Sequence, residues 1–82
     1  MAIERFLWTD HAVVRLNERR LRRDDVELAI RQGHALRRAN AGQADWLIAG
    51  VTPDGSAFEA IYDHPVRRDE TTARIVSVWR VS

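Results

Sequence analysis

The chain has 82 residues, which is enough for one compact domain with a single core and too few for a second domain. All 13 of its basic residues are arginine, its net charge is +1, and it has no cysteine, so neither a disulfide framework nor a thiolate metal site is available. No apolar run reaches the roughly 18 residues of a membrane-spanning helix, and the N-terminus lacks a secretory pattern. We therefore expect a soluble, cytoplasmic protein without a membrane partner.

The small net charge hides an uneven distribution. Residues 1–40 hold nine arginines against six acidic residues, a net charge of +3, whereas residues 41–82 hold four against six, a net charge of −2. Five of the arginines fall within residues 15–23. A local patch of this kind can attract a phosphate ligand even when the whole chain is nearly neutral.

The first half of the chain predicts two helices, with a weak strand at residues 3–8 before them. Thr9 is a suitable N-cap for a first helix over residues 10–20, whose buried stripe would include Ala12 and Leu16. Residues 21–22 resemble a tight connection, and a second helix follows, beginning at Asp24 and ending at Gly33.

After Gly33 the hydrophobic period changes from helical to two, which is typical of strands. Strands are predicted at residues 44–51, 56–62 and 74–81, with a weaker one at 34–39, and the turns at 40–42 and 52–55 would join them as hairpins. Residues 63–73 are expected to form a mobile loop. The fold class is therefore α+β: a helical hairpin, with or without a short strand before it, packed on a three- to four-stranded antiparallel sheet, as a single domain over residues 1–82.

Three ionisable residues at four-residue spacing, His11, Arg15 and Arg19, share one face of the first predicted helix. Cleavage of RNA without a metal needs an acid or base and a positive charge near the phosphate, which a histidine and two arginines can supply. The alternative is structural: His11 would help to cap the helix, and the arginines would form a solvated face paired with nearby acids.

Further candidates lie in the second half. Strict alternation in the last strand places Arg74 and Arg80 on one face, where they either line a groove or extend from the strand ends into water. Tyr62 and His64, beside the long loop, are candidates for proton transfer or base stacking, or simply flank a turn.

Metal and cofactor sites are not predicted. The three histidines have no metal-ligand spacing, and no glycine-rich phosphate loop is present. A DNA-binding helix-turn-helix is also disfavoured, because the two helices run directly into strands without a third supporting helix.

The segment with His11, Ala12, Arg15 and Arg19 resembles the H-A-x-x-R-x-x-x-R opening of a family of small bacterial domains of unknown function that is grouped with the RelE-like toxins. Residues 46–55 and 74–78 resemble the strand-turn-strand and the R-I-I-S tail of BrnT toxins, from the same broad group. These stretches together cover most of the chain.

The resemblance implies a RelE/BrnT-like toxin fold, and a protein that cleaves RNA and is inhibited by an antitoxin. The leading hypothesis is a metal-independent endoribonuclease of a type II toxin–antitoxin pair that acts on RNA, either free or as ribosome-bound mRNA, and uses no cofactor. Its catalytic residues would be His11, Arg15, Arg19 and Arg74, and its substrate-binding residues Arg80, Tyr62 and His64. The alternative is a non-catalytic RNA- or protein-binding module on the same fold. Whether it forms a homo- or hetero-oligomer is left open.

Overall fold

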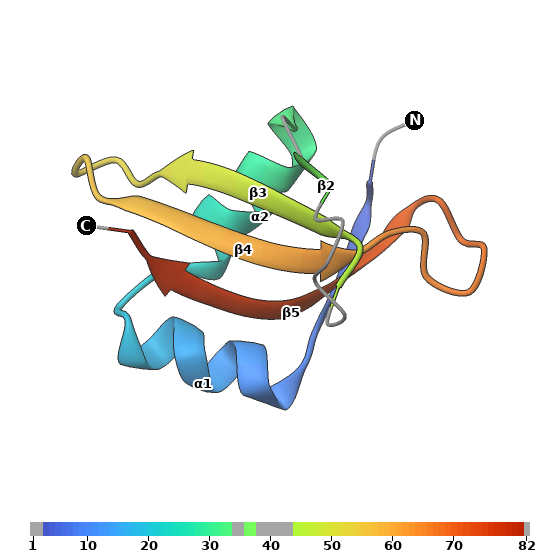
Figure 1. Ribbon diagram of the computed structural model, residues 1–82, viewed down its shortest axis with the longest axis horizontal. Coiled ribbons are helices and arrows are strands. Elements are labelled where there is room, and N and C mark those ends of the chain that lie inside the picture. Colours follow the sequence, from blue (N-terminus) through green and yellow to red (C-terminus); the bar gives the residue numbers. More distant parts are fainter. Residues whose placement is uncertain (1–2, 34–35, 38–43, 82) are drawn as a thin grey trace.

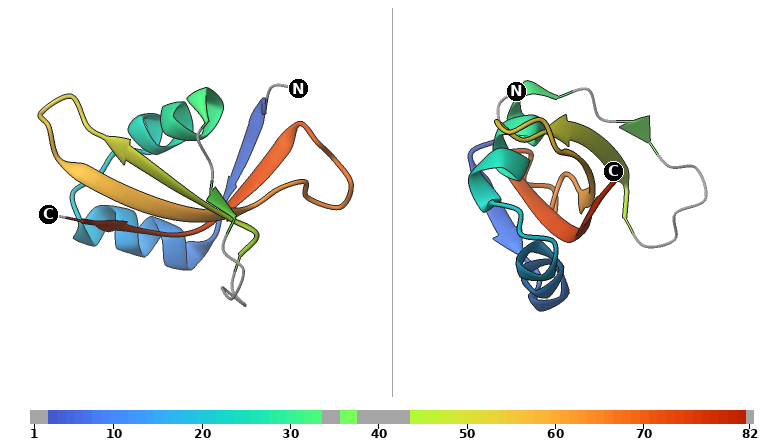
Figure 2. Two further views of the ribbon diagram at one scale, coloured as in Figure 1. Left: turned by 45° about the horizontal axis from the view of Figure 1, so that its top comes forward. Right: turned by 90° about the vertical axis from the view of Figure 1, so that its left-hand side faces the viewer.

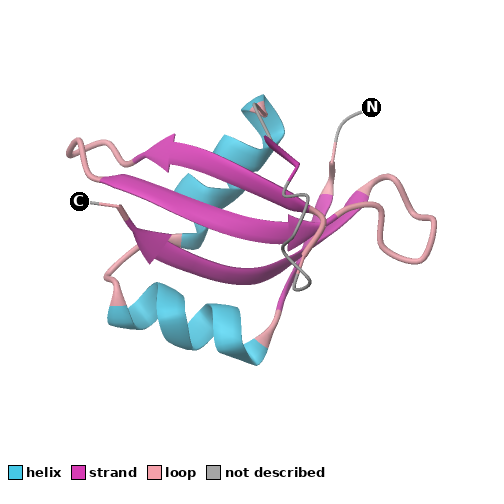
Figure 3. Cartoon of the chain, viewed as in Figure 1, coloured by secondary structure: helices cyan, strands magenta, loops and turns pink. Residues whose placement is uncertain are grey.

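The computed structural model describes residues 3–33, 36–37 and 44–81, and shows an α+β architecture of two helices and one mixed sheet (Figure 1). Figure 3 distinguishes the helices, the strands and the loops by colour in the same view. The predicted turn at 40–42 and most of the weak strand at 34–39 lie outside the described residues. In chain order the elements are β1 (Arg5–Trp8), α1 (Asp10–Glu18), α2 (Arg23–Gln32), β2 (Leu36–Arg37), β3 (Trp46–Val51), β4 (Ala57–Asp63) and β5 (Thr72–Arg80).

Helix α1 begins where the sequence predicts and ends earlier. The hydroxyl of Thr9 accepts a hydrogen bond from the backbone N–H of Ala12 at 3.0 Å, which confirms the N-cap. At the other end Arg20 adopts a left-handed backbone, with φ 56°, and the N–H of Leu21 reaches back to the carbonyl of Leu16 at 3.0 Å. This is the pattern of a Schellman motif, so the helix stops at Glu18 rather than at residue 20.

Five strands form the sheet, in the order β1-β5-β4-β3-β2, and β2 contributes only two residues. Strands β2 to β5 pair antiparallel with their neighbours. Strand β1, however, pairs parallel with the first half of β5, so the expectation of an antiparallel sheet is wrong at this edge. A parallel pair needs a long connection. Both helices and three strands separate β1 from β5 here, and a four-residue strand carries no pattern that reveals its direction.

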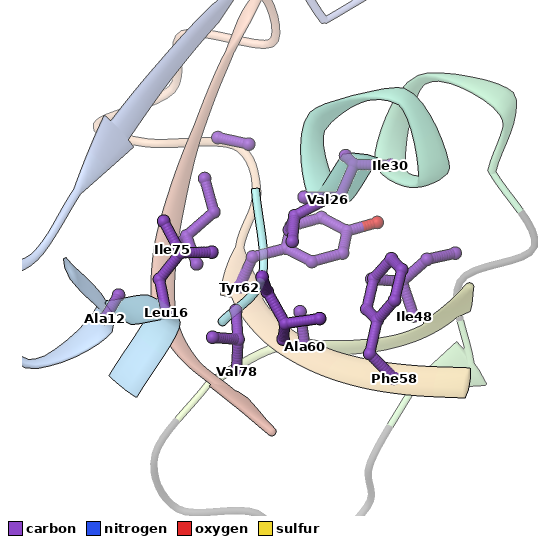
Figure 4. Close-up of a cluster of buried hydrophobic side chains, with 12 residues drawn as sticks. Ala12, Leu16, Val26, Ile30, Ile48, Phe58, Ala60, Tyr62, Ile75 and Val78 are labelled. Carbon is purple, nitrogen blue, oxygen red and sulfur yellow. The ribbon is translucent and has the colours of Figure 1, made fainter. Parts of the chain in front are cut away.

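Both helices contribute to one core on the same side of the sheet, but they pack on different strands: α1 against β5 and α2 against β3 (Figure 2). The helical pair is therefore held together mainly through the sheet. Figure 4 shows the side chains where helices and sheet meet. The core cluster consists of Ala12, Leu16, Leu21, Val26, Ile30, Ile48, Phe58, Ala60, Tyr62, Ala73, Ile75 and Val78.

Candidate functional site

The predicted stripe on α1 faces solvent. His11, in the first turn, and Arg19, the C-cap, are exposed. Arg15 forms an ion pair with Glu18 at 2.9 Å, with 42% of its side chain exposed. The stripe is therefore accessible to a ligand along its whole length, although one of its two arginines already has an acidic neighbour.

A β-bulge in β5 separates the two arginines that strict alternation places together. Ile61 of β4 pairs with Ser77, and the next residue, Tyr62, pairs with Ile75, which leaves Val76 without a partner. An extra residue of this kind reverses the alternation of side chains beyond it. Arg80 consequently lies on the helix-covered face and Arg74 on the opposite face, so the prediction that they share a face is wrong.

Arg80 caps the C-terminus of α1. Its Nε donates a hydrogen bond to the carbonyl of Arg19 at 2.6 Å, and Nη2 donates one to the carbonyl of Arg20 at 3.3 Å. The last carbonyls of a helix lack partners within the helix and carry partial negative charge, so a guanidinium stabilises them. Part of the hydrogen-bonding capacity of Arg80 is therefore used by the protein itself.

Arg74 is also engaged by the protein. Its Nη2 lies 2.5 Å from the Oδ2 of Asp63, which is the residue opposite it on β4. The Oδ1 of Asp63 accepts the backbone N–H of Asp45 at 3.1 Å. This ion pair links the start of β5 to the end of β4 and to the segment that enters β3.

Tyr62 and His64 lie in different environments. Tyr62 is only 4% exposed and packs beneath α2, beside Val26 (Figure 4), and burial raises the pKa of its phenol. His64 lies at the sheet end, with its Nε2 2.7 Å from the carbonyl of Glu70. Among the described residues, no hydrogen bond or ion pair joins His11 to Arg74, Tyr62 or His64, so the predicted set does not meet at one point through direct contacts.

An arginine-lined pocket does form at the opposite end of the sheet, where the α1–α2 turn meets the end of β5 and the β3–β4 turn. Its volume is about 220 Å³. We call it the arginine pocket; the residues that line it are Arg20, Arg22, Asp25, Thr52, Pro53, Asp54 and Arg80. Of these arginines, the sequence predicts only Arg80 as a site residue. The available signal was the density of arginines in residues 15–23, which a search for i,i+4 spacing does not use.

The charges of the pocket are three guanidinium groups against two carboxylates. Asp54 accepts hydrogen bonds from the hydroxyl of Thr52 and the N–H of Ser56, and these bonds hold the pKa of its carboxyl below the usual value. Arg20 and Arg22 are exposed, and in the part of the chain that the structure describes neither forms an ion pair. Their guanidinium groups are therefore available to an anion.

Within 3–33, 36–37 and 44–81, no three His, Asp or Glu side chains are grouped closely enough to hold a metal ion. No helix in those ranges has the length and apolar character required to cross a membrane.

The fold and the pocket define a small α+β domain with an arginine-rich surface. The model of one protein family, the domain of unknown function DUF4258, matches residues 8–80, and the chain belongs to this family. The match runs from the last residue of β1 to the last residue of β5, so it includes both helices, the bulge and the arginine pocket. No curated protein and no solved structure matches the chain.

Proposed function

We propose that this protein binds RNA through the surface formed by the arginine pocket and the adjoining stripe on α1. The observation that carries the proposal is the convergence of Arg20, Arg22 and Arg80 on one pocket from two separate parts of the chain. Arginine can bind a phosphate with two parallel hydrogen bonds. The adjoining stripe adds Arg19, which is exposed at the C-cap of α1, whereas Arg15 is paired with Glu18.

Direct measurement of RNA affinity tests this proposal. The probe is a fluorescent 20-nucleotide single-stranded RNA, and the readout is anisotropy over a range of salt concentrations. The test variant is the double substitution Arg20→Asn with Arg22→Gln. Asparagine tolerates the left-handed backbone of residue 20, and the side chain of Arg22 makes no capping bond, so both changes remove charge without removing a structural contact.

We expect the double variant to bind about tenfold more weakly, and the slope of log affinity against log salt to fall by about 1.4, because two phosphate contacts are lost. Arg31→Gln is the control for loss of a positive charge away from the pocket. It removes one positive charge from the last turn of α2, six residues or about 9 Å along the helix from Asp25, the residue of α2 that lines the pocket. Equal affinities of the double variant and the wild type, or no RNA binding by the wild type at low salt, would rule out the proposal.

Endoribonuclease activity is the second candidate. The observation in its favour is that His11 is exposed and lies one turn from Arg15 on the helix that leads to the arginine pocket. A histidine there can exchange a proton with the RNA 2′-hydroxyl while the arginines hold the phosphate. The test is to incubate total RNA, with and without ribosomes, with the wild type and with folded His11→Ala. Cleavage that persists in the variant would exclude this role for His11.

The assignment to the RelE/BrnT-like toxins remains part of the proposal. What supports it is the α+β architecture together with the motifs around His11 and Arg74. A domain of this kind would be paired with an antitoxin protein, and co-expression with the product of a neighbouring reading frame tests for that partner. Failure of the two chains to copurify would count against the toxin assignment and leave RNA binding intact.

A further inference from the structure

The β4–β5 loop, predicted over residues 63–73, spans residues 64–71 and contains a short hairpin turn with arginines at its tip. The N–H of Val66 donates to the carbonyl of Asp69 at 3.3 Å, and the N–H of Asp69 donates to the carbonyl of Val66 at 2.8 Å. These two reciprocal hydrogen bonds close a two-residue turn whose central residues are Arg67 and Arg68. The hairpin extends beyond the end of the sheet, at the end of the molecule opposite the arginine pocket (Figure 1).

The backbone of this turn does not favour the residues that occupy it. Arg67 and Arg68 have φ values of 49° and 67°. Two consecutive positive φ angles are typical of a type I′ turn, where Asn-Gly is preferred because a side chain crowds the left-handed backbone. The sequence therefore accepts a conformational cost to place two guanidinium groups here, and such costs are concentrated at functional sites.

A network around Asp69 holds the base of the hairpin. Its carboxylate accepts hydrogen bonds from the N–H of Thr71 at 2.9 Å, the hydroxyl of Thr71 at 2.6 Å and the hydroxyl of Thr72 at 2.9 Å. With its oxygens bonded to the threonines, Asp69 forms no ion pair with either tip arginine in the described chain. Both arginines are exposed; Arg67 also lines a pocket with Asp45 and Asp63, whereas Arg68 does not line that pocket.

The same combination of residue and backbone occurs at the arginine pocket. The described residues other than glycine that have a positive φ are Arg20, Arg67 and Arg68, all of them arginine. Arginine makes up 13 of the 82 residues, so composition alone does not account for this. The two turns that contain these left-handed arginines lie near opposite ends of the long axis of the molecule, which measures 34 Å.

We infer that the hairpin tip is a second phosphate-binding site, which contacts the same RNA strand at a distance from the arginine pocket. This inference rests on the RNA-binding function proposed above and extends it from one contact region to two. Two sites on one ligand raise its overall affinity because the second contact forms within the complex. The span implies that an RNA too short to reach both ends binds through one site only.

Replacement of the tip by its preferred residues gives a direct test. The double substitution Arg67→Asn with Arg68→Gly removes both charges and supplies the sequence favoured in a type I′ turn, so we expect a melting temperature higher by about 5 °C. For the 20-nucleotide RNA we expect affinity to fall about tenfold and the salt slope to fall by about 1.4. The charge-retaining control, Arg67→Lys with Arg68→Lys, keeps both positive charges, so we expect it to keep the salt slope of the wild type.

The pocket variant separates this inference from the function on which it rests. A tip variant that is more stable and binds RNA as well as the wild type, while the Arg20 and Arg22 variant binds weakly, would overturn the second site and leave the proposed function standing. Weaker binding by both variants supports two sites. Weaker binding by the tip variant alone supports the tip and overturns the pocket, and a wild type that does not bind RNA overturns both.

Discussion

Replacement of Arg80 by alanine is expected to destabilise the protein through loss of the α1 cap. Arg80 was predicted to bind substrate, but its Nε and Nη2 donate to the carbonyls of Arg19 and Arg20. Arg19 is the C-cap of α1, and Arg20 after it has a left-handed backbone, so the helix does not continue beyond these carbonyls. Without the guanidinium, water would have to bind them.

The size of the effect follows from two contributions. A hydrogen bond from a charged group contributes about 1.5–3 kcal/mol when well buried, and a positive charge at a helix C-terminus about 0.3–1 kcal/mol. Here both bonds are exposed to solvent, and only the bond from Nε is short, at 2.6 Å. We therefore expect Arg80→Ala to lower the free energy of unfolding by about 1.5 kcal/mol, and Arg80→Lys by about 1 kcal/mol, because lysine cannot donate through a planar fork.

Urea denaturation followed by tryptophan fluorescence measures these changes, with Arg74→Ala as the matched control. Arg74 lies on the same strand and forms an ion pair with Asp63, but its side chain is 51% exposed, so its removal should cost less than about 0.5 kcal/mol. Equal losses for Arg80→Ala and Arg74→Ala, or a loss below about 0.5 kcal/mol for Arg80→Ala, would show that the cap contributes nothing of its own.

Three further predictions concern stability. Gly50→Ala should lower the free energy of unfolding in a urea titration by about 1–3 kcal/mol, because the added Cβ would lie 2.5 Å from the Cζ of buried Phe58. The control Ala49→Val, at an exposed position on the same strand, should leave that free energy nearly unchanged. Thr9→Ala should cost about 1 kcal/mol, and an Asp at that position should recover much of it if capping is the cause. Hydrogen bonds from Thr71 lower the pKa of Asp69 from 3.8 to about 2, so the contribution of this carboxylate to stability is complete above pH 3.8 and is lost as the pH falls towards 2. Asp69→Asn should therefore flatten that part of the curve of stability against pH. A curve that the substitution leaves unchanged would contradict the role of the network.

Most elements of the fold were predictable because their signals are local. The Thr9 cap, the buried stripe of Ala12 and Leu16, and the three long strands follow from side-chain type and spacing in short windows. The direction of β1 was not predictable, because the pairing of Arg5 with Thr72 depends on residues far apart in the chain. The early end of α1 was missed because Arg20 occupies the left-handed position where glycine is expected.

The candidate site was less predictable than the fold because its geometry depends on one inserted residue. Without the bulge at Val76, Arg74 and Arg80 would share a face, as the alternation of the strand suggests. The Val-rich sequence around the bulge carries no glycine or other mark of irregularity. Sequence spacing thus predicted that Arg74 and Arg80 share a face, which the bulge contradicts, whereas Arg20 and Arg22, which line a pocket with Arg80, have no regular spacing.

The distribution of left-handed arginines connects the folding argument to the functional one. At Arg20 the left-handed backbone ends α1, and at Arg67 and Arg68 it closes a hairpin, so glycine or asparagine would serve the fold better at all three positions. An arginine that is unfavourable for the fold at each of three positions in two turns is better explained by what its guanidinium group contacts outside the protein than by the turns themselves. Stability and RNA affinity should therefore change in opposite directions when these arginines are replaced, a relation that a purely structural role for them does not predict.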